Sequence, residues 1–204
     1  MSDSEGGFIL VGALLISLAV IIASVMSFIS VDPNVETVID DGAMISIDFA
    51  HYEIHEGDHF KAGYQDITLN VGDTIELLFT TPNTTKLMHW TLTAQGTGGA
   101  SVIVYENTTT SNDGIVVKKW NRYRDNTNAG EMIVTYNPTI ISNGSKMSEK
   151  WFDVDDKTSE IDGSTRGSSE FILKRDTKYL VRLTANSNGM KGGIGGDWYE
   201  HTFD

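Results

Sequence analysis

Residues 8–30 read FILVGALLISLAVIIASVMSFIS, and this stretch divides the chain into two unlike parts. It contains no charged residue. A run of about 20 apolar residues is long enough to cross the roughly 30 Å hydrocarbon core of a bilayer as a helix. Everything after Asp32 is polar, acidic and patterned like β-strands. The sequence therefore predicts one membrane-spanning or bundle-forming helix that carries one β-rich domain.

Three interpretations of this apolar run are open. It is a membrane anchor, a pilin-like helix whose copies pack into a filament core, or a buried helix of a soluble fold. The tail before it, residues 1–7 (MSDSEGG), lacks the basic residues that a cleaved signal peptide needs. More than about 20 uncharged residues is also long for a soluble core helix. We therefore expect a single N-terminal anchor with the large domain outside.

The composition of the whole chain narrows the class of protein. It has 204 residues, a formal net charge of −13 and no cysteine. Such acidity disfavours a nucleic-acid partner, because neutralising phosphates needs a basic face. The lack of cysteine excludes disulfides, thiolate metal sites and a cysteine nucleophile. We expect one acidic domain with a sizeable core that packing alone holds together.

Residues 31–43 form a short neck between the apolar run and the domain. Asp32-Pro33 is a helix-stop signal, because proline disfavours helix at the preceding residue. The apolar residues at positions 35, 38 and 39 are spaced for one further helical turn. Residues 40–42 (DDG) then favour a tight turn. The domain begins at Met44 and runs to the end of the sequence, residues 44–204.

From Met44 onward the apolar period changes from helical to two. Short alternating runs are separated by clusters of Gly, Asn, Pro and Ser, which is typical of an all-β, jelly-roll-like antiparallel β-sandwich. The stretch 101–105 is apolar on both faces and fits a central strand. Residues 144–170 are interpreted as an excursion loop, and 186–196, which contain GMKGGIGG, as a glycine turn. The predicted strands are 45–49, 67–71, 75–79, 88–92, 101–105, 115–117, 132–136, 171–173, 179–183 and 198–201.

One stretch matches a catalytic motif. His55-Glu56-Gly57-Asp58-His59 fits the His-Glu-x-x-His pattern of zinc proteases, which needs a helix that puts both imidazoles on one face. An alternating strand pattern precedes it, so the helical context is missing. His51, His55 and His59 would span about 26 Å along a straight strand. We therefore expect no metal and no other cofactor, and His55 and His59 are metal candidates at most.

Acidic residues near position 155 form a second candidate metal site. Asp153 and Asp155 lie in the sequence WFDVDDK, as in a calcium-binding loop. The EF-hand pattern needs glycine at its sixth position and glutamate at its twelfth, where this chain has Thr158 and Ser164. A solvated acidic turn is the better interpretation, and weak calcium binding at the loop stays open.

A basic cluster with aromatic residues stands out in the acidic chain. A patch of this kind can stack on bases or sugars, although it can instead pair with carboxylates of a neighbouring loop or subunit. Trp90 and Trp198 are further candidates for a sugar platform, but tryptophans in strand patterns are more often core. The members of the proposed interaction patch are Lys118, Lys119, Trp120, Arg122 and Arg124.

Three asparagines lie in Asn-x-Ser/Thr patterns, which are acceptor sites for glycosylation. They are Asn83, Asn107 and Asn143. The chain is rich in threonine and asparagine, so such matches also arise by chance. They bear on function only where the host glycosylates its surface proteins.

A series of short motifs runs in order from about Tyr52 to His201. They are HEG (55–57), HF (59–60), GYQD (63–66), TPNTTK (81–86), His89, VYE (104–106), NR (121–122), GSTR (163–166), EFILK (170–174), DTKYLVR (176–182) and WYEH (198–201). In these motifs the chain resembles a group of small virion-associated proteins of tailed phages. The resemblance implies a β-sandwich structural protein of a virus particle, without catalytic residues. The apolar run departs from that group and indicates a version anchored in a membrane or envelope.

Together these observations predict a viral structural protein that is not an enzyme. It would be an oligomeric spike or decoration subunit on a virion surface or membrane, acting in assembly or host attachment. Its expected partners are copies of itself, other virion proteins, a lipid membrane and a host-surface glycan or receptor, but no nucleic acid. Two alternatives remain: a pilin-like filament subunit with an outer β domain, and a cell-surface carbohydrate-binding module.

Overall fold

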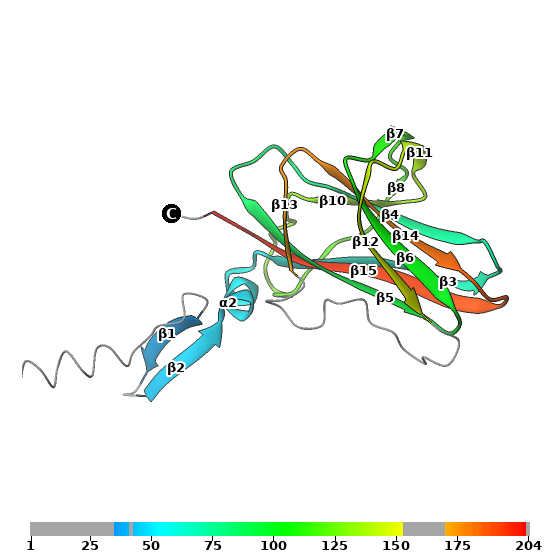
Figure 1. Cartoon of the computed structure of the whole chain (residues 1–204). Coiled ribbons are helices and arrows are strands. Elements are labelled where there is room, and N and C mark those ends of the chain that lie inside the picture. The colour runs from blue at the N-terminus through cyan, green and yellow to red at the C-terminus, as the bar shows by residue number, and fades with distance from the viewer. Residues whose placement is uncertain (1–34, 41–42, 153–169, 203–204) are drawn as a thin grey trace, which may run out of the picture. The chain divides into compact units, whose positions relative to one another are not determined.

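The structure is a computed structural model that describes residues 35–40, 43–152 and 170–202 (Figure 1). Its internal contacts define two compact units, which divide between Phe49 and Ala50. No helix in these described ranges is both long and apolar enough to span a membrane. The predicted anchor at residues 8–30 lies outside the described residues, and so do Asp153 and Asp155.

The first unit contains an antiparallel hairpin. It pairs β1 (Val35–Asp40) with β2 (Ala43–Asp48), and Val35 lies opposite Asp48. The helical turn predicted over positions 35–39 is therefore wrong. The segment VETVID is rich in β-branched residues, which favour extended backbone, and this preference outweighs the helical spacing of its apolar residues.

The second unit is a β-sandwich of two antiparallel sheets, which confirms the predicted all-β class. In the five-stranded sheet the order is β13 (Phe171–Leu173), β5 (Leu87–Gly96), β15 (Met190–His201), β3 (His59–Leu69) and β9 (Trp120–Asn121). In the six-stranded sheet it is β12 (Ser145–Phe152), β6 (Ala100–Glu106), β14 (Lys178–Ala185), β4 (Thr74–Thr80), β10 (Ile133–Tyr136) and β8 (Ile115–Val116). A small ribbon pairs β7 (Thr109–Asn112) with β11 (Thr139–Ser142).

The main strands alternate between the two sheets along the chain. β3, β5, β13 and β15 belong to the five-stranded sheet, whereas β4, β6, β12 and β14 belong to the six-stranded one. The chain therefore crosses from one sheet to the other at almost every connection, as the interleaved colours of Figure 1 show. β6 lies between β12 and β14, which confirms the central strand predicted at 101–105.

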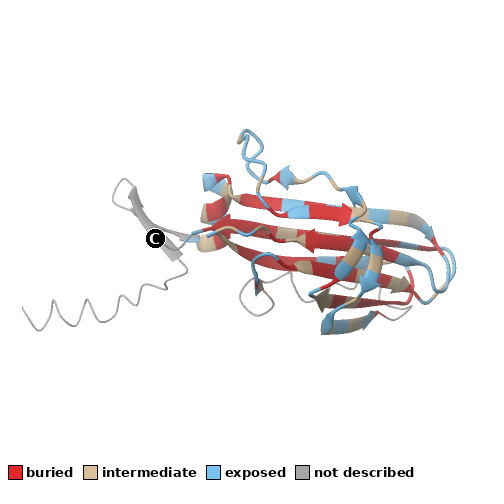
Figure 2. Cartoon of the chain, turned by 90° about the horizontal axis from the view of Figure 1, so that it is seen from above, coloured by how far each residue is buried: buried red, intermediate tan, exposed pale blue. Residues whose placement is uncertain are grey.

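The inner faces of the two sheets form one apolar core. Trp90 and Trp198 from the five-stranded sheet meet Phe79 from the six-stranded sheet, with ring centroids 4.9 and 6.5 Å apart. All three side chains are fully buried. In Figure 2 the buried residues run along the long strands, and the exposed ones gather in the loops. Trp90 and Trp198 are thus core residues, which removes them as platforms for sugar binding.

A short helix precedes the sandwich, where the sequence pattern predicted a strand continuing to Phe49. α2 spans Phe49–Glu56, and Gly57 ends it in a left-handed conformation with a φ of 83°. The amide of Gly57 donates to Ile54 O, and that of Asp58 donates to Glu53 O, which is the Schellman arrangement. Because the helix has only eight residues, its apolar period is too short to recognise in the sequence.

Two loop predictions were also wrong. Residues 186–196 were expected to be a turn, yet β15 begins at Met190 and pairs with β3 and β5 on its two sides. Residues 144–170 were expected to be an excursion loop, yet β12 occupies Ser145–Phe152 and pairs with β6. In both places pairing with neighbouring strands outweighs the weak strand preference of glycine, serine and lysine.

Candidate functional site

The outer face of the five-stranded sheet carries three rows of residues that cross β3, β15 and β5. The strand register places Lys61 beside Asp197 and Thr91 in the first row. The second row is Gly63, Gly195 and Thr93, and the third is Gln65, Gly193 and Gln95. The middle of this face is therefore made of glycines, with longer polar side chains at its edges.

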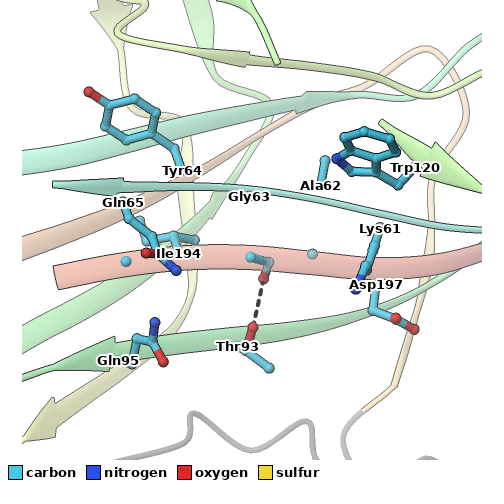
Figure 3. Close-up of a pocket in the computed structure, with 13 residues that line it drawn as sticks. Lys61, Ala62, Gly63, Tyr64, Gln65, Thr93, Gln95, Trp120, Ile194 and Asp197 are labelled. Carbon is cyan, nitrogen blue, oxygen red and sulfur yellow. Dashed lines mark hydrogen bonds between the residues drawn. The ribbon is translucent and has the colours of Figure 1, made fainter. Parts of the chain in front are cut away.

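These rows line an open groove of about 470 Å³. The glycines leave its floor at the level of the backbone. Lys61, Asp197 and Trp120 stand at one end of the groove, and Gln65 and Gln95 at the other (Figure 3). A second hollow of about 410 Å³ also has Lys61 and Trp120 in its lining. The ring of Trp120 therefore borders both hollows.

Trp120 joins this site because β9 pairs with β3, which puts Trp120 opposite Lys61. The Trp120 residue is 40% exposed. The ammonium of Lys118 lies 3.8 Å from the centre of the indole ring, and the guanidinium carbon of Arg124 lies 4.6 Å from it. Both distances suit cation–π attraction. Of the predicted patch, Trp120 lines the groove, and Trp120, Arg122 and Arg124 line the adjoining hollow.

Arg122 lies near a contact between His59 and Asp197 at the same end. His59 is fully buried, and its Nε2 lies 2.6 Å from Asp197 Oδ1, while its Nδ1 lies 3.0 Å from the carbonyl of Ala50. Arg122 Nη1 stands 3.6 Å from Asp197 Oδ2. The Asp197 carboxylate is therefore held between the His59 ring and the Arg122 guanidinium.

Lys119 has a structural role instead. Its ammonium donates hydrogen bonds to the carbonyls of Gly130 and Met132 at 3.0 and 2.7 Å, and both bonds are partly buried. Burial lowers the pKa of Lys119, while the carboxylates of Glu200 and Glu131 act in the opposite direction. Of the predicted patch, Lys119 is thus the member that secures a loop and does not face the groove.

The histidines of the zinc-protease motif do not share one site. His51 and His55 lie one turn apart on the exposed side of α2, with ring centroids 4.9 Å apart, whereas His59 lies beyond the helix in β3. His59 is held by Asp197 and Ala50. No group of three or more metal-ligating side chains occurs among the residues described by the structure.

The three glycosylation acceptors differ in their surroundings. Asn83 and Asn107 are exposed, and Asn107 has a positive φ of 61°. Asn143 is half-buried, and its side-chain oxygen accepts a hydrogen bond of 2.9 Å from Arg182. The side-chain oxygen of Asn143 is thus engaged within the fold, while the other two asparagines are exposed.

A cluster of titratable residues lies between α2 and the end of β15. Glu53 on α2 is buried, and its Oε1 lies 3.9 Å from His201 Nδ1. Burial raises the pKa of Glu53 to about 7, and the carboxylates of Asp58 and Glu56 raise it further against a smaller opposite effect of Lys86. Burial also lowers the pKa of His201. Burial thus shifts both groups towards their neutral forms in the folded chain.

Glu53 predicts a measurable pH dependence of stability. Because the folded pKa of about 7 exceeds the unfolded value of 4.5, the folded chain binds the extra proton, and stability falls as pH rises from 4.5 to 7. Glu53→Gln removes this titration. The free energy of unfolding of the variant, relative to that of the natural chain, should therefore rise by about 2–3 kcal/mol from pH 5 to pH 8. Urea unfolding at both pH values measures this change. The exposed-site control Asp125→Asn should show no such change, and an equal shift in both variants would refute the assignment.

Part of the groove was missing from the sequence-based prediction. Lys61, Thr93, Gln95 and Asp197 come from three strands that are far apart in the chain, so their proximity depends on sheet register. The glycines of β15 also come in adjacent pairs, at 192–193 and 195–196, so the local sequence shows no period of two there.

Comparisons of the chain with protein-family models, with curated proteins and with solved structures find no match. The resemblance to virion-associated proteins of tailed phages therefore stays a prediction. The functional argument rests on the residues and geometry of the chain itself.

Proposed function

We propose that this chain is a surface subunit of a virus particle, in which the apolar run of residues 8–30 anchors a jelly-roll domain. The domain acts in assembly and host attachment, without catalysis. Its partners are other copies of the chain, other particle proteins and a lipid membrane. The observation that carries the proposal is the order of eight strands in the sandwich.

Eight strands make up the body of the two sheets, and we number them 1 to 8 in chain order: β3, β4, β5, β6, β12, β13, β14 and β15. With these numbers, neighbours in the five-stranded sheet run 6-3-8-1 and those in the six-stranded sheet run 5-4-7-2. This interleaved order is that of a jelly roll, a fold of viral capsid and lectin domains. β8, β9 and β10 are additions at the edges of the two sheets. The order supports a particle protein over a pilin-like filament subunit.

The interior of the sandwich supports a structural role. Jelly rolls also include cupins, in which the space between the sheets can hold a reaction centre. In this chain that space holds large, fully buried side chains, among them Phe60, Phe79, Trp90 and Trp198. We therefore place its function on the outer surface, where the groove lies.

The apolar run supports the anchor. It is long enough to cross a bilayer, and one arginine at the centre of such a helix costs about 2.5–3.5 kcal/mol of insertion free energy. Leu18 and Ile22 lie near the middle of the run. Replacing both with arginine should thus prevent insertion while leaving the domain unchanged.

Flotation with phosphatidylcholine vesicles tests this proposal. The natural chain should float with the vesicles, and the double variant Leu18→Arg/Ile22→Arg should remain at the bottom of the gradient. A matched control, Val71→Arg/Ile141→Arg, changes two apolar residues that are 61% and 69% exposed in the domain, and it should float normally. A natural chain that stays soluble and monomeric without lipid or detergent would contradict the anchor. An intact mass cut near Gly7, with filaments that form without lipid, would favour the pilin-like alternative.

A further inference from the structure

We propose that the groove across β3, β15 and β5 binds an oligosaccharide that carries one acidic sugar. The acidic sugar lies at the Trp120 end, and neutral sugars extend over the glycine floor towards Gln65 and Gln95. The inference adds a ligand class to the proposed surface subunit, but its site and its test are independent of the membrane anchor.

The shape of the groove suits an extended, narrow ligand. From Lys61 to Gln65 the floor runs along β3 for about 13 Å at the usual rise of a strand. Gly63, Gly193 and Gly195 form its middle, and a Cβ built on Gly195 would lie 3.0 Å from Thr93 Oγ1. Backbone at this depth allows a ligand to approach closely, which side chains would prevent.

The charge of one end selects an anion. Lys61, Lys118, Arg122 and Arg124 are exposed, and they gather there although the chain as a whole has a net charge of −13. The carboxylate of Asp197 at this end is already bound by His59 and lies near Arg122. The end therefore keeps an excess of positive charge. Guanidinium and ammonium groups bind carboxylates and sulfates through charge-assisted hydrogen bonds.

The aromatic ring at the same end suits a sugar. Trp120 offers an apolar surface, with 40% of the residue exposed, between the two hollows. The cations beside its ring, Lys118 and Arg124, belong to exposed and flexible side chains that can turn towards a bound anion. An acidic sugar presents both an apolar ring face and an anionic group, so it can use the indole and the cations together.

The opposite end of the groove is neutral and polar. Gln65 and Gln95 are exposed, and within the described part of the chain the structure gives their side-chain amides no hydrogen-bond partner. Primary amides can both donate and accept, which suits the hydroxyl groups of a neutral sugar. Thr93 adds a hydroxyl between the two ends.

This asymmetry favours a glycan over a nucleic acid. A single strand of nucleic acid carries a phosphate on every nucleotide. Proteins that bind it therefore have a positively charged groove that follows the whole backbone. Here the cations occupy one end only, and the rest of the groove is uncharged. A ligand with charge at one end and hydroxyls along its length matches this pattern.

The test uses the full-length chain in detergent micelles on an oligosaccharide array. The array contains sialylated, uronic-acid and sulfated members beside their neutral parents, and the strongest binder is then titrated by calorimetry. We expect it to bind at least about tenfold more tightly than its neutral parent, and Lys61→Gln and Arg124→Gln each to weaken it about tenfold. Lys146→Gln removes a cation on the other sheet and should leave binding unchanged.

A floor variant separates the groove from simple charge attraction. Gly195→Val adds a side chain to the floor without changing charge and should abolish binding. If that variant does not fold, Gln65→Ala replaces it and should weaken binding measurably. The proposal is overturned if no acidic member binds, if neutral parents bind equally well, or if both groove variants bind normally. Tighter binding of a short oligothymidylate, lost in the same lysine and arginine variants, would assign the groove to nucleic acid instead.

Discussion

Replacing Glu200 with alanine is expected to lower the free energy of unfolding by about 3–5 kcal/mol. Glu200 is fully buried, and its carboxylate accepts hydrogen bonds from the indole of Trp198 at 2.9 Å and from the amides of Glu131 and Met132. Alanine would leave three N–H donors without their acceptor. The half-buried ammonium of Lys119, which binds carbonyls of the same loop, would also lose a nearby opposite charge.

Urea unfolding of the full chain in micelles, followed by tryptophan fluorescence, measures this effect, because Trp90 and Trp198 are buried. The matched control is Glu131→Ala, since the side chain of Glu131 is 41% exposed and contributes little through its distant partner Lys86. The control should change stability by no more than about 0.5 kcal/mol. Equal stabilities of the Glu200 and Glu131 variants would show that the buried carboxylate does not hold the loop.

The second large effect is expected at Gly196. This glycine faces the core from β15, and a Cβ at its position would lie 2.5 Å from Phe79 Cε1 and 2.8 Å from Trp90 Nε1. Neither ring can move aside in a packed interior without displacing its neighbours. Gly196→Ala should therefore destabilise the domain by about 1–3 kcal/mol through overpacking.

The adjacent residue provides the control for this substitution. Gly195 faces the groove, and its added Cβ would meet only the rotatable hydroxyl of Thr93 at 3.0 Å among side-chain atoms. Gly195→Ala should change stability by no more than about 0.5 kcal/mol. The pair of variants is compared by the same urea unfolding measurement. If Gly195→Ala were the more damaging of the two, the assignment of inner and outer faces along β15 would be wrong.

Alternating apolar residues predicted the strands whose two faces differ in side-chain character. β4, β5 and β14 each have large apolar residues facing the core, and their sequences predicted them at nearly the observed positions. β15 was missed over its first half because glycine carries no side chain to show the alternation. Its inner glycines make room for aromatic rings contributed by other strands, and this requirement is not visible in the local sequence.

The candidate site was predicted only in part for a related reason. Trp120, Arg122 and Arg124 are close in sequence, so their cluster could be recognised directly. Asp197 and Lys61 complete that end of the groove through pairing between β3 and β15, which joins residues more than a hundred positions apart. A local pattern also cannot tell that Lys119 points to backbone carbonyls while its neighbours face solvent.

Protease treatment of intact virus particles, purified from cultures that produce this chain, tests the central proposal most directly. Mass spectrometry should find the chain in particles purified on a density gradient. Brief protease treatment should then release peptides of the domain, while peptides from residues 8–30 remain with the particle. Absence of the chain from such particles, or protection of the whole domain from protease, would contradict an anchored surface subunit.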